Sequence, residues 1–443
     1  MLAWPLFLSQ GSSTILQFID RMFLTWYSPQ GMAATGPSGM LAFAFQSLFI
    51  GVVGYAGTFV AQYTGAEKPR QAVAVIWQAL YLAILAALLI FFLEPLGPVI
   101  FRVSGHTAQM RHFEHLFFRV FMYGAFPGVG LAAISGYFIG RGLNRIVLVV
   151  NLLAVVVNML LDYLLIFGHW GFPALGVTGA GLASVVAQSV GFVVMMVCFL
   201  QASNRIHPGR SWRPDFALMR RLLRFGSANG IQFALDMMVW TTFLLLVGRM
   251  GVTELAATNL GFQLNAFAFF PIIGFGMATS TLVGQNLGKN RADLADRAVW
   301  SAIHMSLLFT FMVALAYIFL PGWLMLPFGA EADPAAFRPV REMGMVILRF
   351  VATYCLFDVG NLIFSAALKG AGDTLFVSIF SPMTVAITML LPILLWCVPR
   401  GGLGIYGAWT FLTLAVCILM LVFLWRYLTG HWRTMRVIEQ EVI

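Results

Sequence analysis

The sequence predicts an all-α integral membrane protein with twelve transmembrane helices in two six-helix bundles, related by a parallel pseudo-two-fold repeat. Three observations predict this fold: the composition, the number of long apolar runs, and a similarity between the two halves of the chain. Of the 443 residues, 60% are hydrophobic and only 10% are charged. Soluble globular proteins carry about 25% charged residues, so this chain is a polytopic membrane protein.

Twelve apolar runs are long enough to cross a hydrocarbon core of roughly 30 Å as helices. They cover residues 3–26, 39–64, 72–97, 113–140, 146–168, 176–200, 219–249, 254–286, 296–322, 340–368, 375–398 and 403–428. The gaps between them are short and carry turn residues, for example Gly370-Ala371-Gly372-Asp373. Such residues are typical of turns between helices.

The basic residues predict the orientation of these helices. Most Lys and Arg residues fall in gaps after even-numbered runs or in the C-terminal tail, for example Lys68, Arg141 and Lys289. Cytoplasmic loops of membrane proteins carry this excess, so both termini are expected in the cytoplasm, with the chain in the plasma membrane. Because the charge is spread over short gaps, the formal net charge of +9 does not indicate a nucleic-acid partner.

The longest polar gap, residues 201–218, lies near the midpoint of the chain. It predicts a cytoplasmic connector between an N-terminal lobe, residues 1–200, and a C-terminal lobe, residues 219–443. The four cysteines lie in apolar stretches without metal-ligand spacing, so they are interpreted as small core residues without disulfides: Cys198, Cys355, Cys397 and Cys417.

An internal match supports the two-lobe division. Residues 32–79 align without a gap on residues 255–302 at an offset of 223, and the identities include Thr35/Thr258, Gln62/Gln285 and Gly65/Gly288. A second match at an offset of 228 pairs Gly176-Gly179-Ala180 with Gly404-Gly407-Ala408. Parallel repeats of this kind place a substrate site between the halves, near the middle of the membrane, and predict alternating access.

Two polar residues stand out in the fifth apolar run. Asn158 and Asp162 are four residues apart, so on a helix they lie on the same face. A carboxyl group within a membrane span costs roughly 3 kcal/mol on insertion scales, and its default interpretation is a functional site facing a cavity. Asp20, Asp236 and Asp358 also fall well inside apolar runs. An acid in such a place can exchange its proton for a cation.

Several motifs together resemble the multidrug and toxic compound extrusion (MATE) family. They are Gln62-Tyr-Thr-Gly65, Gly284-Gln-Asn-Leu-Gly288, Lys369-Gly-Ala-Gly-Asp-Thr374, Gly176-Val-Thr-Gly-Ala-Gly-Leu-Ala183, Pro5 and Phe18-Ile-Asp20. The resemblance covers essentially the whole chain. It implies efflux of lipophilic, often cationic compounds in exchange for Na⁺ or H⁺, with no cofactor besides that ion and no enzymatic activity. We expect a monomer whose partners are toxic organic cations and the lipid bilayer.

The resemblance also implies roles for individual residues. Asp20, Asn158 and Asp162 match the polar constellation of the N-terminal lobe, with Ser184 in the place of a family Thr, and these oxygens suit Na⁺ while the carboxylates alone would serve H⁺. No metal other than Na⁺ is expected there. Pro5 resembles a proline whose kink responds to the charge state of the acid.

The chain departs from the family pattern at two positions. Arg21 follows Asp20 where relatives usually have a small or polar residue, and we expect its side chain to point outward. Tyr163 follows Asp162 where relatives often have Pro. In the second half, Asp236 and Asp358 have the spacing of acids that another branch of the family uses, so we expect them to contact substrate or a second cation.

Two other functions remain open at this point. A flippase of lipid-linked oligosaccharide from the same superfamily would favour a basic central cavity, whereas the charges inside the runs are acidic. A membrane-embedded enzyme would need a nucleophile and base, or a metal set, inside the bilayer. His112 and His115 have a spacing that could hold a metal, but they lie at the outer edge of the fourth run. Helix-packing acids bonded to Ser, Thr or Asn are the structural alternative for each of the four Asp residues.

Overall fold

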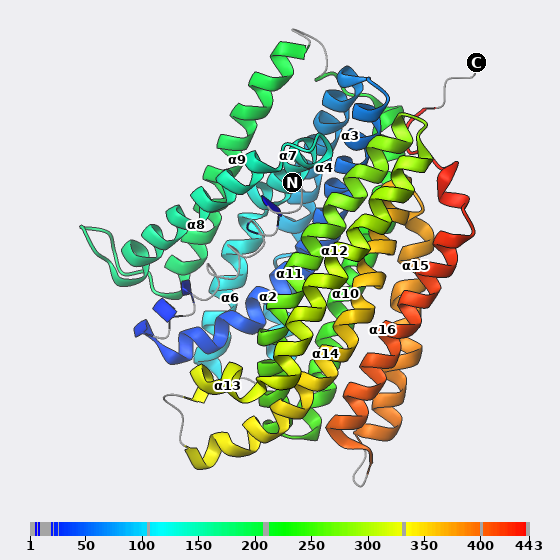
Figure 1. The fold of residues 1–443 in the computed structure, drawn as a ribbon. Helices are drawn as coiled ribbons and strands as arrows, with labels where there is room; N and C mark the ends of the chain where they lie inside the picture. The colour runs from blue at the N-terminus through cyan, green and yellow to red at the C-terminus, as the bar shows by residue number, and fades with distance from the viewer. Residues whose placement is uncertain are drawn as a thin grey trace. The chain divides into compact units, whose positions relative to one another are not determined.

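The computed structural model describes residues 5–6, 8, 19–20, 22–24, 26–103, 107–206, 212–329, 334–398 and 402–439. Within these residues the chain is helical and forms no β-strand (Figure 1). Among the described residues, ten helices are long and apolar enough to cross a membrane, and one bent pair forms an eleventh candidate span. The first predicted span, residues 3–26, lies mostly outside the described residues.

Helix α2 of the N-terminal half begins after Ser28, whose hydroxyl accepts a hydrogen bond from Gly31 N at 3.1 Å, with Pro29 in the first helical position. Both features are typical helix starts. The helices are α2 (Pro29–Gly54), α3 (Ala56–Gly65), α4 (Pro69–Leu93), α5 (Leu96–Val103), α6 (Ala108–Tyr123), α7 (Ala125–Gly140), α8 (Asn144–Phe167) and α9 (Val177–Ile206).

The bent pair consists of α6 and α7, whose axes differ by 46° at Gly124. A side chain on Gly124 would collide with Val185 of α9, so glycine permits the close packing at this bend. A single apolar run of the sequence, residues 113–140, is therefore a broken helix.

The helices of the C-terminal half are longer. They are α10 (Phe216–Met250), α11 (Val252–Gly288), α12 (Ala292–Phe319), α13 (Pro321–Gly329), α14 (Pro334–Ala371), α15 (Thr374–Val385) and α16 (Gly404–Leu428). After α15 the chain continues through two π-helical turns, Ala386–Leu390 and Ile393–Cys397, on either side of Pro392. Proline lacks the N–H that a regular α-helix would use there.

Helix boundaries repeat along the chain. The helix pair α2–α3 ends at Gly65 and α11 ends at Gly288, while α4 begins at Pro69 and α12 at Ala292. Both pairs differ by 223 residues, the offset of the sequence match. The short helices α5 and α13 follow α4 and α12 in the same way. The internal repeat of the sequence is therefore also a repeat of helices.

The described contacts divide the chain into two compact units. The first contains residues 1–234, 288–290 and 437–443, and the second contains residues 235–287 and 291–436. The boundary falls within α10, because its first half packs on α2: Asn229 Nδ2 donates to the carbonyl oxygen of Gly51 at 2.8 Å. The lobes 1–200 and 219–443, with the connector 201–218, were inferred from the count of apolar runs, and that division stays a prediction.

Each unit has its own apolar core. In the first unit, side chains of α3, α4 and α7 pack together, and Phe59, Ile76 and Tyr137 are fully buried. In the second, Trp409 of α16 is fully buried among aromatic rings of α10 and α11. Helices α12, α14 and α16 lie side by side in this unit (Figure 1). The large side chains of the outer faces, such as Phe92 and Leu308, are exposed, as lipid-facing side chains are.

Candidate functional site

Helix α8 carries the two polar residues of the fifth apolar run. Asn158 and Asp162 are both fully buried, whereas Val149, Val156 and Leu160 of the same helix are more than half exposed. The helix therefore presents one polar face to the interior of its unit and an apolar face outward. A buried carboxyl group needs hydrogen bonds or a cation to offset its lost hydration.

The Asn158 side chain links the acids. Its amide is oriented with the nitrogen toward the carboxylates, because the opposite orientation would set its oxygen against two other oxygens. The nitrogen then donates to Asp20 Oδ1 at 2.8 Å and to Asp162 Oδ2 at 3.2 Å, and the oxygen accepts from the backbone N–H of Ser184 at 3.2 Å. The Ser184 hydroxyl lies 3.3 Å from the same end of the amide. The structure thus brings all four predicted residues together.

The second oxygen of Asp162, Oδ1, is buried and lacks a hydrogen-bond donor among the described residues. The carboxyl group of Asp20 lies within hydrogen-bonding reach of Asp162. Two carboxyl groups this close in an apolar interior cannot both carry a charge unless a cation lies with them. The arrangement can therefore hold either a shared proton or a small cation.

Other predicted features of the first span fall partly outside the described residues. Pro5 is helical and buried, and Asp20 is helical and half-buried. Phe18 and Arg21 lie outside the described residues, as does most of the chain between Pro5 and Asp20. The predicted kink at Pro5 and the outward direction of Arg21 therefore stay predictions.

The second unit holds a different set of polar residues on α14. Asp358 is 7% exposed, and its Oδ1 accepts a hydrogen bond from Asn361 Nδ2 at 2.9 Å. Tyr354, one turn earlier, is 2% exposed, and its hydroxyl has no hydrogen-bond partner in the described part of the chain. Tyr354 was missed from the sequence, although its spacing of four residues from Asp358 is the same signal that identified Asn158 and Asp162.

Asp236 of α10 lies among different neighbours. Its Oδ1 accepts from the Ser381 hydroxyl of α15 at 3.4 Å, and Lys369 of α14 lies close enough to interact with it electrostatically. Lys369 was assigned to a loop from the sequence, but α14 continues to Ala371 and carries Lys369 in its last turn. Lys369 therefore supplies a positive charge that interacts electrostatically with Asp236.

A groove of about 340 Å³ also lies in the second unit, between α11, α13 and α14. Its walls are mostly apolar, with two side-chain amides and two phenylalanine rings. It is lined by Ala256, Asn259, Leu260, Gln263, Phe328, Phe337 and Val340. Such a surface fits the apolar part of a small molecule and adds a few hydrogen bonds.

The histidines do not assemble a metal centre in the described residues, which contain no group of three His, Cys, Asp or Glu side chains able to hold a metal. His115 Nε2 instead lies 2.9 Å from Glu94 Oε1. The four cysteines are free thiols.

Comparison with known proteins identifies the family. The family model described as MatE matches residues 5–164 and 230–394, most of the chain. The chain belongs to the MatE family. The two matched stretches begin 225 residues apart, close to the offset of the internal repeat. The resemblance to the MATE family inferred from the motifs is thus confirmed.

Curated relatives agree with this assignment. A probable multidrug resistance protein NorM of Thermotoga maritima is 25% identical over 427 residues, covering 95% of this chain and 90% of the relative. A protein of the same name from Pseudomonas putida is 29% identical over 383 residues, covering 84% of this chain and 81% of the relative.

Solved structures confirm the fold class. A crystal structure of MATE in the straight conformation matches with a TM-score of 0.84 at 18% identity, covering 98% of this chain and 96% of that one. An outward-facing multidrug resistance MATE family transporter matches with a TM-score of 0.85 at 19% identity and the same coverage. The MatE protein described here is therefore an all-α, multi-pass membrane protein with the family's twelve helices in two bundles.

Proposed function

We propose that this MatE protein is a secondary active multidrug antiporter that exports lipophilic, often cationic compounds in exchange for Na⁺ or H⁺ by alternating access. The proposal is carried by one observation: a buried carboxylate oxygen of Asp162 lacks a hydrogen-bond donor in the described residues. The Asn158 amide links the carboxyl group of Asp162 to that of Asp20. Because the site needs a positive charge for balance, the coupling ion and a cationic compound compete for it. Binding of one displaces the other, so neither crosses the membrane without exchange.

The relatives and the groove support the choice of cargo. Relatives along nearly the whole chain carry the name of multidrug resistance proteins. The groove of the second unit offers apolar walls, two phenylalanine rings and two uncharged amides, which suit a lipophilic compound. Phenylalanine faces also attract organic cations.

We further propose the plasma membrane of a bacterium as the location, with both termini in the cytoplasm, and a monomer as the functional form. The excess of Lys and Arg in gaps after even-numbered spans supports this orientation. No cofactor besides the coupling ion and no enzymatic step is part of the proposal. An oligosaccharide flippase is less well supported, because the buried charged side chains of the candidate site are acidic.

Dye efflux from proteoliposomes tests the proposal. Efflux is measured under an imposed Na⁺ gradient and, separately, under an imposed pH gradient, for the wild type and for Asp162→Asn. We expect one gradient to drive efflux of a cationic dye in the wild type and neither to do so in Asp162→Asn. Glu342→Gln is the matched control, since Glu342 is exposed and pairs only with Arg338 one turn away among the described residues.

The outcomes separate the parts of the proposal. If neither gradient drives efflux in the wild type, antiport is wrong and the flippase becomes the better candidate. If Asp162→Asn keeps full efflux, Asp162 is not part of the coupling mechanism. If Glu342→Gln loses activity equally, loss of a negative charge anywhere explains the result, and the site carries no special role.

A further inference from the structure

The segment of the first unit that leads into α10 is bound to α4. Gln78 of α4 is fully buried, and both ends of its amide contact this segment. Its Nε2 donates to the carbonyl oxygen of Arg213 at 3.1 Å, and its Oε1 accepts from the backbone N–H of Asp215 at 3.1 Å. The hydroxyl of Tyr81, also on α4, donates to the carbonyl oxygen of Trp212. Because a buried amide needs these hydrogen bonds, Gln78 fixes the backbone of the segment on α4.

Helix α10 begins on this segment and divides its side chains between two faces. Asp215 lies just before the helix, and its Oδ1 accepts from the backbone N–H of Leu218 at 3.0 Å, as in a helix cap. Leu218 and Leu222 are buried in the apolar core of the first unit. Phe216 and Arg220, one turn apart on another face of the helix, are exposed.

The exposed side chains combine large aromatic rings with positive charge. Trp212 is 55% exposed and Phe216 is 78% exposed. Residues 212–224, called the 212–224 stretch below, contain four arginines and a single acid, Asp215. Three of these arginines are exposed and form no ion pair within the described residues: Arg213, Arg220 and Arg224. The stretch therefore presents apolar rings and unneutralised guanidinium groups together.

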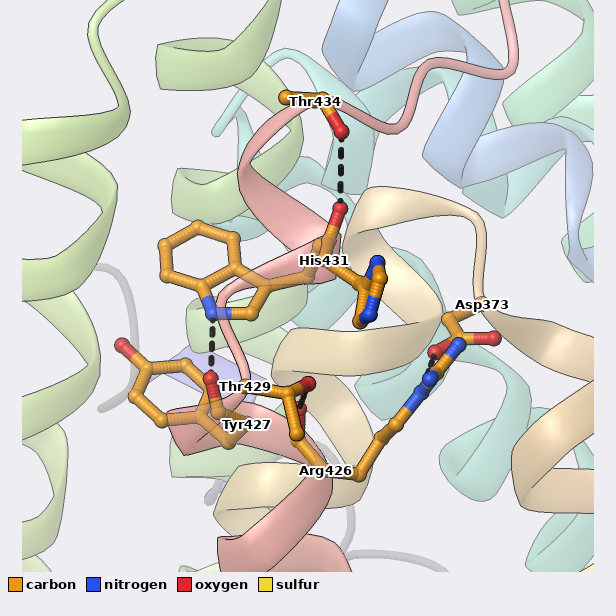
Figure 2. A network of polar contacts seen from close by, with 7 residues as sticks. Asp373, Arg426, Tyr427, Thr429, His431 and Thr434 are labelled. Carbon is orange, nitrogen blue, oxygen red and sulfur yellow. Dashed lines mark hydrogen bonds and ion pairs between the residues drawn. The ribbon is translucent and has the colours of Figure 1, made fainter.

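The end of α16 and the segment after it, in the second unit, have the same residue types but pair them within the protein. Trp432 is 1% exposed, its indole Nε1 donates to the carbonyl oxygen of Tyr427 at 3.0 Å, and the two rings stack with centroids 5.0 Å apart. Arg426 Nε donates to Asp373 Oδ2 at 2.7 Å (Figure 2). Exposed tryptophan and unpaired arginine are thus not a general property of the segments that flank the long helices of this protein.

We propose that the 212–224 stretch is a binding site for anionic phospholipid of the bilayer. Aromatic rings such as those of Trp212 and Phe216 are favoured where lipid headgroups meet water. Guanidinium groups bind phosphate oxygens through paired N–H donors, and basic residues beside a membrane-spanning helix attract anionic lipid. Gln78 holds the backbone so that rings and arginines are presented at one place. The inference depends on the chain lying in a bilayer and is independent of antiport.

Thermal unfolding of the full chain in detergent tests the binding. The protein is titrated with phosphatidylglycerol, which is anionic, or with phosphatidylcholine, which has no net charge. The test variant replaces the three exposed arginines of the stretch by glutamine: Arg213→Gln, Arg220→Gln and Arg224→Gln. The matched control removes three exposed arginines of α14: Arg338→Gln, Arg341→Gln and Arg349→Gln. Each protein is compared with its own melting temperature without lipid.

We expect phosphatidylglycerol to stabilise the wild type at lower concentrations than phosphatidylcholine does. The test variant should raise the phosphatidylglycerol concentration for half-maximal stabilisation at least ~10-fold, and the control should change it less than ~2-fold. Equal changes in the two variants would show that total charge explains the effect, and the site would be overturned. Equal action of the two lipids on the wild type, or the same stabilisation by inorganic phosphate, would also overturn it.

Fluorescence quenching tests where the stretch lies. The four native cysteines are replaced by Ala, and Ala217→Cys or Thr434→Cys, both exposed positions, carries a fluorophore. Each protein is placed in phosphatidylglycerol nanodiscs with or without lipid that carries a quencher in its headgroup. We expect the quencher to lower the fluorescence at residue 217 at least ~2-fold and at residue 434 less than ~1.2-fold. No quenching at residue 217, or equal quenching at both positions, would overturn the site. Loss of dye efflux without loss of quenching would overturn antiport alone.

Discussion

The acids of the two units are balanced in different ways. In the first unit, Asp20 and Asp162 share one amide, and a buried carboxylate oxygen has no hydrogen-bond partner in the described residues. In the second, Asp358 accepts a hydrogen bond from the Asn361 amide, and Asp236 interacts electrostatically with Lys369. We therefore propose that the first site takes up the coupling ion, whereas the acids of the second unit interact with an amide and a lysine of the protein. This difference favours the first site for ion coupling and the second for contacts with cargo.

The largest effect is expected from replacing the asparagine that binds the acids of each unit, Asn158 in the first and Asn361 in the second. Asn158→Leu removes a side chain that donates to both carboxyl groups, while Asn361→Leu removes a donor to one. We expect Asn158→Leu to lower gradient-driven dye efflux about 100-fold, which corresponds to ~2.7 kcal/mol. Asn361→Leu should lower it by less than about 10-fold. Initial rates in proteoliposomes measure both, and equal losses would contradict separate roles for the two sites.

The next largest effect is expected on the stability of the protein when Lys369 of the second unit is replaced. Lys369→Gln leaves Asp236 without its nearby positive charge, so we expect the free energy of unfolding to fall by about 1–3 kcal/mol. Adding Asp236→Asn should restore most of that loss, since no charge then remains unbalanced. Thermal unfolding of the purified protein in detergent measures the wild type, both single variants and the double variant. Additive effects within ~0.5 kcal/mol would show that the two side chains do not interact.

A smaller effect is expected at Asp358. If Asp358 attracts cargo by charge, Asp358→Asn should raise the KM for a cationic dye about 10-fold, or ~1.4 kcal/mol, and leave the KM for a neutral substrate unchanged. Efflux under the gradient that drives the wild type measures both substrates. An equal increase in both KM values would instead indicate a change in the shape of the site.

Much of the fold could be predicted from hydropathy and spacing. The predicted span 146–168 corresponds to α8, Asn144–Phe167, and the repeat offset of 223 reappears in the helix boundaries. Hydropathy placed the start of the second span at residue 39, although α2 begins at Pro29. The polar and small residues Gly36, Pro37 and Ser38 lower the local average there, while the Ser28 cap and Pro29 do mark the start.

Other features depend on tertiary contacts and lay beyond a single sequence. The bend at Gly124 follows from its packing against Val185. The π-helical turns around Pro392 interrupt a stretch that the hydropathy of the sequence predicts as one continuous span. In the site, spacing on one helix identified Asn158 and Asp162, and the same rule would have found Tyr354. The proximity of Lys369 to Asp236 joins two helices more than a hundred residues apart in sequence, and no local pattern predicts it.

The smallest expected effect concerns the hydroxyl of Tyr354, with Tyr317 as its matched control. Both tyrosines are buried in the second unit, but Tyr317 donates to the carbonyl oxygen of Leu264 at 2.6 Å, whereas the Tyr354 hydroxyl has no partner in the described residues. Removing a satisfied hydroxyl costs about 1 kcal/mol, so Tyr317→Phe should lower the free energy of unfolding by that amount. Tyr354→Phe should leave it unchanged or raise it by up to ~1 kcal/mol when Na⁺ is absent. If the Tyr354 hydroxyl is instead a ligand for a cation at Asp358, saturating Na⁺ will stabilise the wild type more than Tyr354→Phe. Thermal unfolding with and without Na⁺ therefore decides whether the second unit binds cargo alone or a second ion as well.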